Sequence, residues 1–227
     1  MKCLAVNTAT SIFSLALVED EKVLHIFETP ETRDQGDLLL EHLQDALKKN
    51  DIGFAELDLL AVVTGPGSFT GIRVGLAAMR GIALAAEKPL IGMSSFDMFA
   101  VNDMDVLNIV AVESWRDELF FAVLDGEGSP LLACGNETPE SFSRRFRDNL
   151  TDASRISISG DAGAAVRPLF PHAALTDKEA NAEDVARLAM QKFRKGGIFA
   201  RPVPYYLRAA DTTVSAKISK TMKSVED

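Results

Sequence analysis

The sequence contains few of the residues with which proteins hold metal ions or form cross-links. Its 227 residues include two cysteines, three histidines and one tryptophan. His25, His42 and His172 are not spaced as an HxxxH or HExxH motif, and no CxxC occurs. We therefore expect no metal site in this chain. Cys3 and Cys134 lie in apolar, strand-like stretches, which predicts two buried thiols, no disulfide and a reducing, cytoplasmic environment.

Basic residues are also scarce. The chain has 24 Lys and Arg against 33 Asp and Glu, a formal net charge of −9. A protein that binds tRNA by itself presents a basic surface to the phosphates. The basic clusters at Arg144–Arg147 and Lys192–Lys195 fall on predicted amphipathic helices and are interpreted as solvated faces. We therefore expect any contact with tRNA to be made mostly by a partner.

Long hydrophobic runs are missing as well. The apolar stretches are too short and too interrupted to cross a bilayer, and a strand pattern follows Lys2 without a cleavage site. We expect neither a membrane span nor a signal peptide. The hydrophobic content of 47% and the length are sufficient for one large domain or two small ones.

The most informative stretch is Leu59–Ala86, LLAVVTGPGSFTGIRVGLAAMRGIALAA. It predicts a buried strand at Leu59–Thr64, a tight turn at Gly65–Ser68 and a helix at Phe69–Ala86, with Ser68 as the N-cap. Backbone amides converge at such a helix start and favour anions. The glycine spacing matches neither GxxxxGK[ST] nor GxGxxG, so the nucleotide signal is weak. Capping explains the Ser68 hydroxyl better than nucleophilic catalysis does, because no base is adjacent in the sequence.

Glycines inside this helix each cost about 1 kcal/mol relative to alanine. Gly71 and Gly75 share one face, and Ala77, Gly81 and Ala85 line another. We expect the alanine-containing face to pack inside the domain. For the Gly71 and Gly75 face, packing on a sheet and contact with a partner helix remain equal alternatives.

The rest of the chain alternates between strand and helix patterns. The polar stretch Asn102–Asp105 is interpreted as the boundary between two lobes. The predicted strands are Cys3–Val6, Phe13–Glu19, Lys22–Phe27, Pro89–Met93, Val106–Val112, Glu118–Leu124, Leu131–Cys134 and Arg155–Ser159, and the further helices are Asp37–Lys49, Ser95–Val101, Pro139–Asn149 and Glu183–Arg194.

Four segments together resemble the TsaB (YeaZ) family of bacterial subunits for tRNA threonylcarbamoyladenosine biosynthesis. They are GPGSFTGIRVGLAAMRGIALA, the opening LAVNTAT, IGMSSFD after the helix, and YLR near the C-terminus. The resemblance implies a two-lobed actin-like α/β fold, as in sugar kinases, Hsp70 and actin, with mixed sheets flanked by helices. Residues 1–105 would form the N-terminal lobe, and residues 106–227 a smaller C-terminal lobe with a flexible tail.

The resemblance also implies a function. The chain would be a non-catalytic scaffold that binds a TsaD-like catalytic subunit and a TsaE-like ATPase for threonylcarbamoyl transfer to adenosine 37 of ANN-decoding tRNAs. It would contain no catalytic residue, cofactor or metal, while ATP and a metal ion would be bound in the partner subunits. The alternative is an autonomous actin-like phosphotransferase or glycoprotease-like peptidase. A third interpretation is a free-standing homodimer.

The resemblance places the partner surface on the helix that begins near Phe69 and on the helix Asp37–Lys49, in a four-helix arrangement. Arg73 would pair either with a partner carboxylate or within the chain. The predicted contact residues are Leu39, Leu43, Ser68, Phe69, Thr70, Gly71, Arg73, Val74, Gly75 and Ala78.

The chain departs from the family pattern at several positions. Asn7 stands where the superfamily places an aspartate that manages magnesium, and we expect it to satisfy backbone groups of its turn. Gln35-Gly36 replaces a His-Ser pair, and Glu113–Trp115 replaces Asp-Ala-Arg. Trp115 is interpreted as a loop anchor or an interface residue. The turn Gly160–Gly163 is either an anion cradle or a simple turn.

Overall fold

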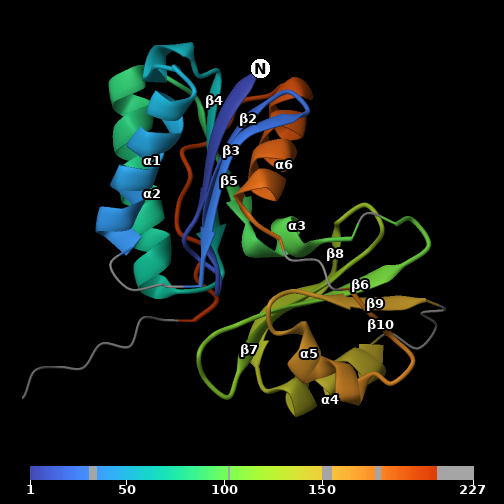
Figure 1. The fold of residues 1–227 in the computed structure, drawn as a ribbon. Helices are drawn as coiled ribbons and strands as arrows, with labels where there is room; N and C mark the ends of the chain where they lie inside the picture. The colour runs from blue at the N-terminus through green and yellow to red at the C-terminus, as the bar shows by residue number, and fades with distance from the viewer. Residues whose placement is uncertain (31–34, 102, 150–154, 177–179, 209–227) are drawn as a thin grey trace, which may run out of the picture.

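The computed structural model describes residues 1–30, 35–101, 103–149, 155–176 and 180–208. Within these ranges the chain forms two five-stranded sheets, one above the other in Figure 1. Their strand orders are β3-β2-β1-β4-β5 and β10-β9-β6-β7-β8. In each sheet the first three strands in sequence pair antiparallel, and the last two add in parallel. The same topology therefore occurs twice, which confirms the predicted two-lobed actin-like fold.

The first sheet lies between two layers of helices. Its central strands β1 and β4 are buried almost throughout, because strands covered on both faces are continuous hydrophobic runs. The edge strand β3 is more exposed. The strands are β1 (Lys2–Asn7), β2 (Phe13–Glu19), β3 (Lys22–Thr29), β4 (Leu59–Gly65) and β5 (Leu90–Ser94).

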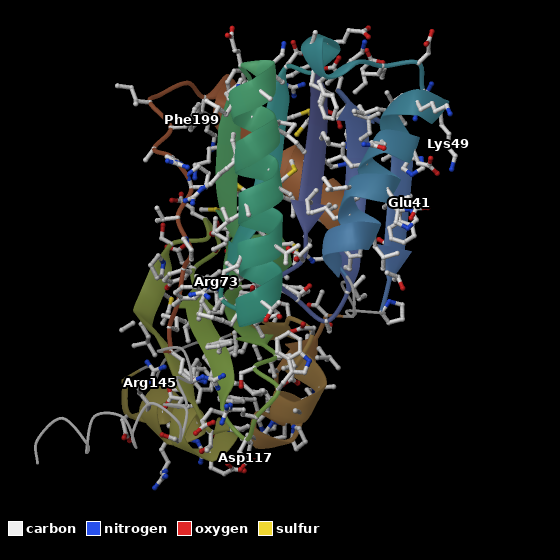
Figure 2. The ribbon with its side chains drawn as sticks, turned by 90° about the vertical axis from the view of Figure 1, so that its left-hand side faces the viewer. Glu41, Lys49, Arg73, Asp117, Arg145 and Phe199 are labelled. Carbon is white, nitrogen blue, oxygen red and sulfur yellow. The ribbon has the colours of Figure 1, made fainter. Side chains whose placement is uncertain are left out.

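Helices α1 (Gln35–Lys49) and α2 (Phe69–Ala86) cover one face of this sheet, and Figure 2 shows them side by side. The Ser68 hydroxyl caps α2 by accepting a hydrogen bond from the Gly71 amide at 3.2 Å, as predicted. By length and mean hydropathy (1.3) α2 could cross a membrane, so the prediction that every apolar stretch is too short and too interrupted is wrong for this helix. Here α2 is the crossover between the parallel strands β4 and β5.

The second sheet has a separate aromatic core on one face. The rings of Phe121 and Phe142 stack with centroids 4.0 Å apart, and Phe146 and Phe170 pack around them. The elements of this lobe are β6 (Leu107–Val112), β7 (Leu119–Leu124), β8 (Pro130–Glu137), α4 (Pro139–Asn149), β9 (Ile156–Ser159), α5 (Gly163–Val166), a 3-10 helix (Arg167–Leu169) and β10 (Ala174–Leu175).

Helix α6 (Ala182–Arg194) returns from the second sheet and covers the other face of the first (Figure 1). Its apolar face joins the core of the first lobe through residues such as Val185 and Ala189. The chain passes from the first sheet to the second between α3 (Ser95–Phe99) and β6, close to the predicted boundary at residue 105. The first lobe nevertheless includes α6, so it is not formed by residues 1–105 alone as predicted.

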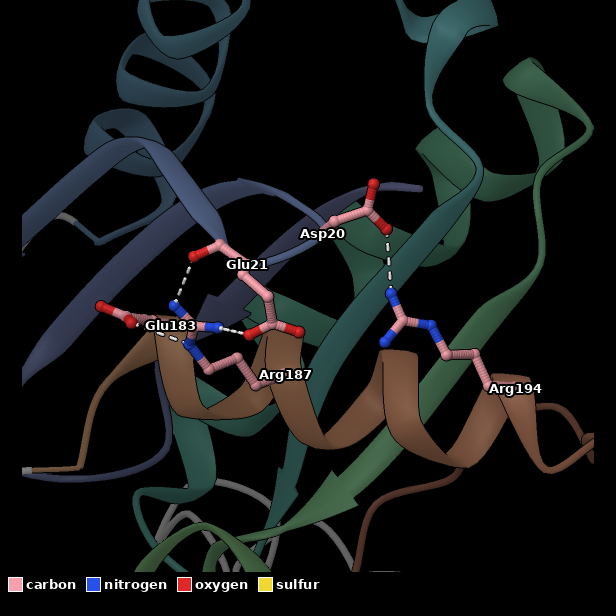
Figure 3. A network of polar contacts seen from close by, with 5 residues as sticks. All are labelled: Asp20, Glu21, Glu183, Arg187 and Arg194. Carbon is pink, nitrogen blue, oxygen red and sulfur yellow. Dashed lines mark hydrogen bonds and ion pairs between the residues drawn. The ribbon is translucent and has the colours of Figure 1, made fainter.

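Two arginines of α6 pair with the turn between β2 and β3 (Figure 3). Arg187 makes 2.8 Å ion pairs with both Glu21 and Glu183, and it also donates to the backbone carbonyl of Glu21. Arg194 pairs with Asp20 at 2.9 Å. The pairs with Glu21 and Asp20 join the exposed side of α6 to this turn, while its apolar face packs in the core.

After α6, residues 199–208 run back along the first lobe as an irregular segment, which we call the strap. The Tyr205 amide donates to the Thr64 carbonyl at 2.8 Å. Arg80 donates to the Pro202 carbonyl, and the Pro202 ring packs against Gly92. The strap thus fixes the position of Tyr205 and its neighbours near the start of α2.

Most predicted elements occur within a residue or two of their predicted ends. The sequence analysis missed the 3-10 helices Phe54–Glu56 and Arg167–Leu169, α5 and β10, which are all four residues long or shorter. The predicted tail lies outside the described residues. Both cysteines are free thiols as predicted, but only Cys3 is fully buried, whereas Cys134 is half-buried.

Candidate functional site

The turn after β1 is closed by its own polar groups. The Asn7 side chain is buried, and its Oδ1 accepts from the Ala9 amide at 3.0 Å. Its Nδ2 donates to Thr10 Oγ1 at 2.7 Å and to the Ile12 carbonyl at 3.2 Å. The prediction that Asn7 satisfies groups of its own turn is confirmed.

The turn Gly65–Ser68 packs directly onto this first turn. The Ser68 amide donates to the Ala9 carbonyl at 2.7 Å. A Cβ at Gly67, whose φ is +154°, would lie 2.0 Å from the same carbonyl oxygen, so only glycine fits there. Thr8 then joins the turn to α2, since its hydroxyl donates to the Gly71 carbonyl at 2.7 Å.

A carboxylate of the second lobe, Asp161, bonds to the turn after β1. Asp161 Oδ2 accepts from the Ser11 amide at 3.0 Å, and Oδ1 accepts from the Glu113 amide at 2.8 Å. Burial raises the pKa of Asp161, while these two amides and the Ser11 hydroxyl act in the opposite direction. The turn Gly160–Gly163 therefore supplies an anion instead of cradling one, and Asp161 ties the two lobes together.

These contacts occupy backbone donors where the two lobes meet. The amides of Ala9, Ser11, Ser68 and Glu113 each bond a group of the chain itself. Chemically, this arrangement joins the two lobes through hydrogen bonds. No group of three His, Cys, Asp or Glu side chains that could hold a metal ion occurs among the described residues.

The predicted contact residues divide into buried and exposed sets. Leu39 and Leu43 of α1 and Gly71 and Gly75 of α2 are buried inside the chain. A Cβ at Gly75 would lie 2.4 Å from Thr8 Oγ1 and 3.4 Å from Val62. The prediction of a direct partner contact by these four residues is therefore wrong, because their face packs against the sheet.

The other predicted contact residues remain accessible. Thr70 and Arg73 are exposed, and Ser68, Phe69, Val74 and Ala78 are partly buried. Figure 2 shows Arg73 on α2, with Glu41 and Lys49 on the neighbouring α1. The Gln35 side chain lies outside what the structure describes.

Arg73 is held in place without a carboxylate. Its guanidinium carbon lies 3.8 Å from the centre of the Phe69 ring, and its Nε donates to the Tyr206 hydroxyl at 3.2 Å. Arg73 forms no ion pair within the described part of the chain. The intramolecular ion pair, one of its two predicted roles, is not formed there.

The exposed side of α2 is the side that we expected to be buried. Ala77, Gly81 and Ala85 face outward, and a Cβ at Gly81 would meet nothing within 4 Å. Leu84 beside them is 83% exposed, and Leu40 on α1 is 50% exposed. The prediction that the face of Ala77, Gly81 and Ala85 is buried is thus wrong, whereas the Gly71 and Gly75 face follows the first of its two alternatives, packing on the sheet. The sequence analysis missed Leu84 as a candidate contact.

Fold and site together define an actin-like protein whose inter-lobe turns are filled by its own groups. A family model described as TsaD, tRNA N6-adenosine threonylcarbamoyltransferase, matches residues 32–192, which is more than half of the chain. The chain belongs to this family. The chain is similar to proteins named TsaB and YeaZ, and over 65 residues, 29% of its length, it is 38% identical to a tRNA N6-adenosine threonylcarbamoyltransferase of Rhodopseudomonas palustris.

The tRNA threonylcarbamoyladenosine biosynthesis protein TsaB of Escherichia coli is 40% identical over 95 residues, covering 42% of this chain and 41% of that protein. The Haemophilus influenzae TsaB is 30% identical over 123 residues, or 52% of each chain. The chain thus spans about half the length of the curated relatives it matches. The structure of YeaZ from Pseudomonas aeruginosa aligns with a TM-score of 0.72 at 24% identity, covering 91% of this chain and 99% of that one, and shows the shared fold.

Proposed function

We propose that this chain is a non-catalytic subunit in the biosynthesis of threonylcarbamoyladenosine in tRNA. It binds a TsaD-like catalytic subunit and a TsaE-like ATPase, which modify adenosine 37 of ANN-decoding tRNAs. The names of its relatives support the pathway. The observation that carries the non-catalytic part is Asp161, which accepts a hydrogen bond from an amide of each lobe and so bonds the groups at the lobe junction to one another.

The proposed contact surface is the outer face of α1 and α2, defined by Leu40, Thr70, Arg73, Gly81 and Leu84. The small residue Gly81 allows a partner helix to approach closely, and the two leucines supply apolar area worth about 25 cal/mol per Å² before ordering costs. Arg73 is already oriented by Phe69 and Tyr206, so little side-chain entropy would be lost when a partner carboxylate binds it.

The remaining components belong to the partners in this proposal. ATP and a metal ion are bound by the other subunits, and tRNA contacts this acidic chain only through the complex. The complex works in the cytoplasm. An autonomous phosphotransferase or peptidase is the rival, and a homodimer through the same surface is a further alternative.

The decisive experiment is co-purification with the TsaD-like and TsaE-like proteins of the same organism. We expect Leu84→Glu to weaken capture of the TsaD-like subunit by at least about tenfold, because it places a charge in an apolar contact. Leu131→Glu is the matched control, since Leu131 is also exposed but lies on β8 of the other lobe. Equal capture of wild type and Leu84→Glu would exclude this surface.

Activity of the isolated chain separates the proposal from its rival. We expect negligible ATPase, peptidase and transferase turnover in the purified chain. Turnover that Asn7→Ala abolishes would establish an autonomous enzyme instead. A change in mass by light scattering on Leu84→Glu, without loss of TsaD binding, would assign the surface to a homodimer.

A further inference from the structure

A groove of about 430 Å³ lies between the C-terminal half of α2 and the strap, and we call it the α2–strap groove. Its apolar lining includes Leu84 of α2, Leu90 of β5, and Phe199 and Pro202 of the strap. Figure 2 shows Phe199 on the side of α2 that faces away from α1. The volume is in the range of ligand pockets in proteins. The groove shares Leu84 alone with the proposed contact surface of α1 and α2, so it is a second surface.

The charge of the groove is opposite to that of the chain. Three cations line it, and within the described part of the chain no acidic side chain does, although the net charge is −9. The cations are Arg80 of α2, Lys88 just after it, and Arg201 of the strap. The same separation of charge extends along both elements, because α2 and the strap contain four arginines and neither Asp nor Glu. The exposed Glu87 precedes Lys88 in the sequence but does not line the groove.

The three cations form no ion pair with a carboxylate within the described residues. Arg80 donates to the Pro202 carbonyl, and Lys88 Nζ donates to the Ala55 carbonyl at 2.6 Å, so neutral groups hold both side chains. Arg201 is exposed. The negative end of the α2 dipole lies nearby, but it amounts to about half an elementary charge against three full positive charges. The groove therefore presents a positive potential to a partner.

Apolar side chains are exposed at the same place. Leu84 is 83% exposed, and Ile198 just before the strap and Val203 within it are exposed as well. Exposed apolar side chains grouped in this way are typical of protein interaction sites. A nucleic acid would need aromatic rings on which its bases stack. Phe199 is the one aromatic lining residue within the described part of the chain, and its ring already stacks on Phe193 with centroids 5.8 Å apart.

From the apolar lining and the three cations without carboxylate partners, we propose that the α2–strap groove binds an acidic peptide segment of a partner protein. An aliphatic or aromatic side chain of the segment packs against Leu84, Leu90 and Phe199. Carboxylates on either side of it pair with Arg201 and the other two cations, and this charge complementarity selects an acidic segment. The inference goes beyond the proposed function and does not rest on it.

The test uses the intact chain and fluorescein-labelled peptides, whose binding is measured by fluorescence anisotropy. The probe is EELFEELLE, and its two controls are KKLFKKLLK, with reversed charges, and EESSEESSE, without apolar side chains. We expect saturable binding of the probe with a Kd below about 100 μM, and binding of each control peptide that is at least about tenfold weaker. Labelled oligouridylate is titrated in parallel and should bind more weakly than the probe.

Two variants assign the binding to the groove. Arg201→Glu should weaken binding of the probe by about tenfold or more, because it places a like charge against the carboxylates. Lys192→Glu, which makes the same change of charge at an exposed site on α6 outside the groove, should bind like wild type. Leu84→Ser, which alters the apolar lining without a change of charge, should also weaken binding. Melting temperatures check that each variant is folded.

Several results would overturn the inference. One is a probe that does not saturate by about 1 mM, and another is a control peptide that binds as tightly as the probe. Equal binding by wild type and Arg201→Glu, or an equal loss in Lys192→Glu, would exclude the groove as the site. Tighter binding of oligouridylate than of the probe would assign the surface to nucleic acid. Because the peptide test needs no other subunit, its failure leaves capture of the TsaD-like subunit as a separate question.

Discussion

Thr8 Oγ1 occupies the space that a side chain at Gly75 would need, 2.4 Å from the position of its Cβ. The same hydroxyl donates to the Gly71 carbonyl at 2.7 Å, one turn earlier in α2. Thr8 is fully buried, so its side chain has little room to move. The contact explains why α2 tolerates the cost of an interior glycine at this position, and it fixes α2 against the turn after β1.

The first prediction compares two glycines in the same helix. Gly75→Ala should lower the free energy of unfolding by about 1–2 kcal/mol, because overpacking against Thr8 exceeds the gain in helix propensity. Gly81→Ala should raise it by about 0.5–1 kcal/mol, because its new methyl group meets only solvent. Both changes in the free energy of unfolding are measured by chemical denaturation, and the m-value should be the same in wild type and variants.

A double variant tests the cause. Combining Gly75→Ala with Thr8→Ala removes the hydroxyl that causes the clash, so the two losses of stability should not add. Strict additivity would show that Thr8 is not the obstacle.

The second prediction concerns the tie between the lobes. Asp161→Ala should speed amide hydrogen exchange at Ser11 and Glu113 by about 10- to 100-fold, since hydrogen bonds to a charged group contribute about 1.5–3 kcal/mol. The exposed Asp117 supplies the control, and Asp117→Ala should leave both amides unchanged. Unaltered protection in Asp161→Ala would mean that other contacts hold the lobes.

The third prediction follows from the raised pKa of Asp161. An acid whose pKa is raised by folding stabilises the folded state at low pH, and this contribution is lost as pH rises from its unfolded pKa toward its folded pKa. The neighbouring Glu113 carboxylate acts in the same direction. The stability of wild type relative to Asp161→Asn should therefore fall with rising pH just above the usual aspartate range. Urea titrations between about pH 3 and pH 7 measure this difference, and a difference that rises with pH would contradict it.

The fourth prediction concerns the ion pairs of α6. Arg187→Met should reduce stability by less than about 1 kcal/mol, because Arg187 is substantially exposed and its partner Glu21 is 83% exposed. The loss should shrink in about 1 M salt, which screens the pairs. Lys192→Met on the same helix is the control for loss of one positive charge. If the loss of stability in Arg187→Met did not depend on salt, it would come from packing of the aliphatic part of the Arg187 side chain.

Local sequence signals were sufficient for most of the fold. Apolar runs with period two or 3.6, together with Ser68 as a cap and Pro89 after α2, predicted nearly all strands and helices close to their observed ends. The Gly65–Ser68 turn and the role of Asn7 were also predictable, because both depend on residues near in sequence. The short elements α5 and β10 were not, since four or fewer residues carry too little periodicity.

The sequence by itself determined the order of the longer helices and strands and the resemblance to TsaB and YeaZ. Only the tertiary structure decided which face of α2 is buried, because both faces are lined with small residues and helical spacing alone cannot distinguish them. It also decided that Asp161 joins Ser11 to Glu113, and that Arg73 rests on Phe69 and Tyr206. Asp161 lies 150 positions from Ser11 and 48 from Glu113, and Arg73 lies 133 positions from Tyr206, so these three contacts follow from how the two sheets and the strap pack. The contact of Arg73 with Phe69, by contrast, is local to α2.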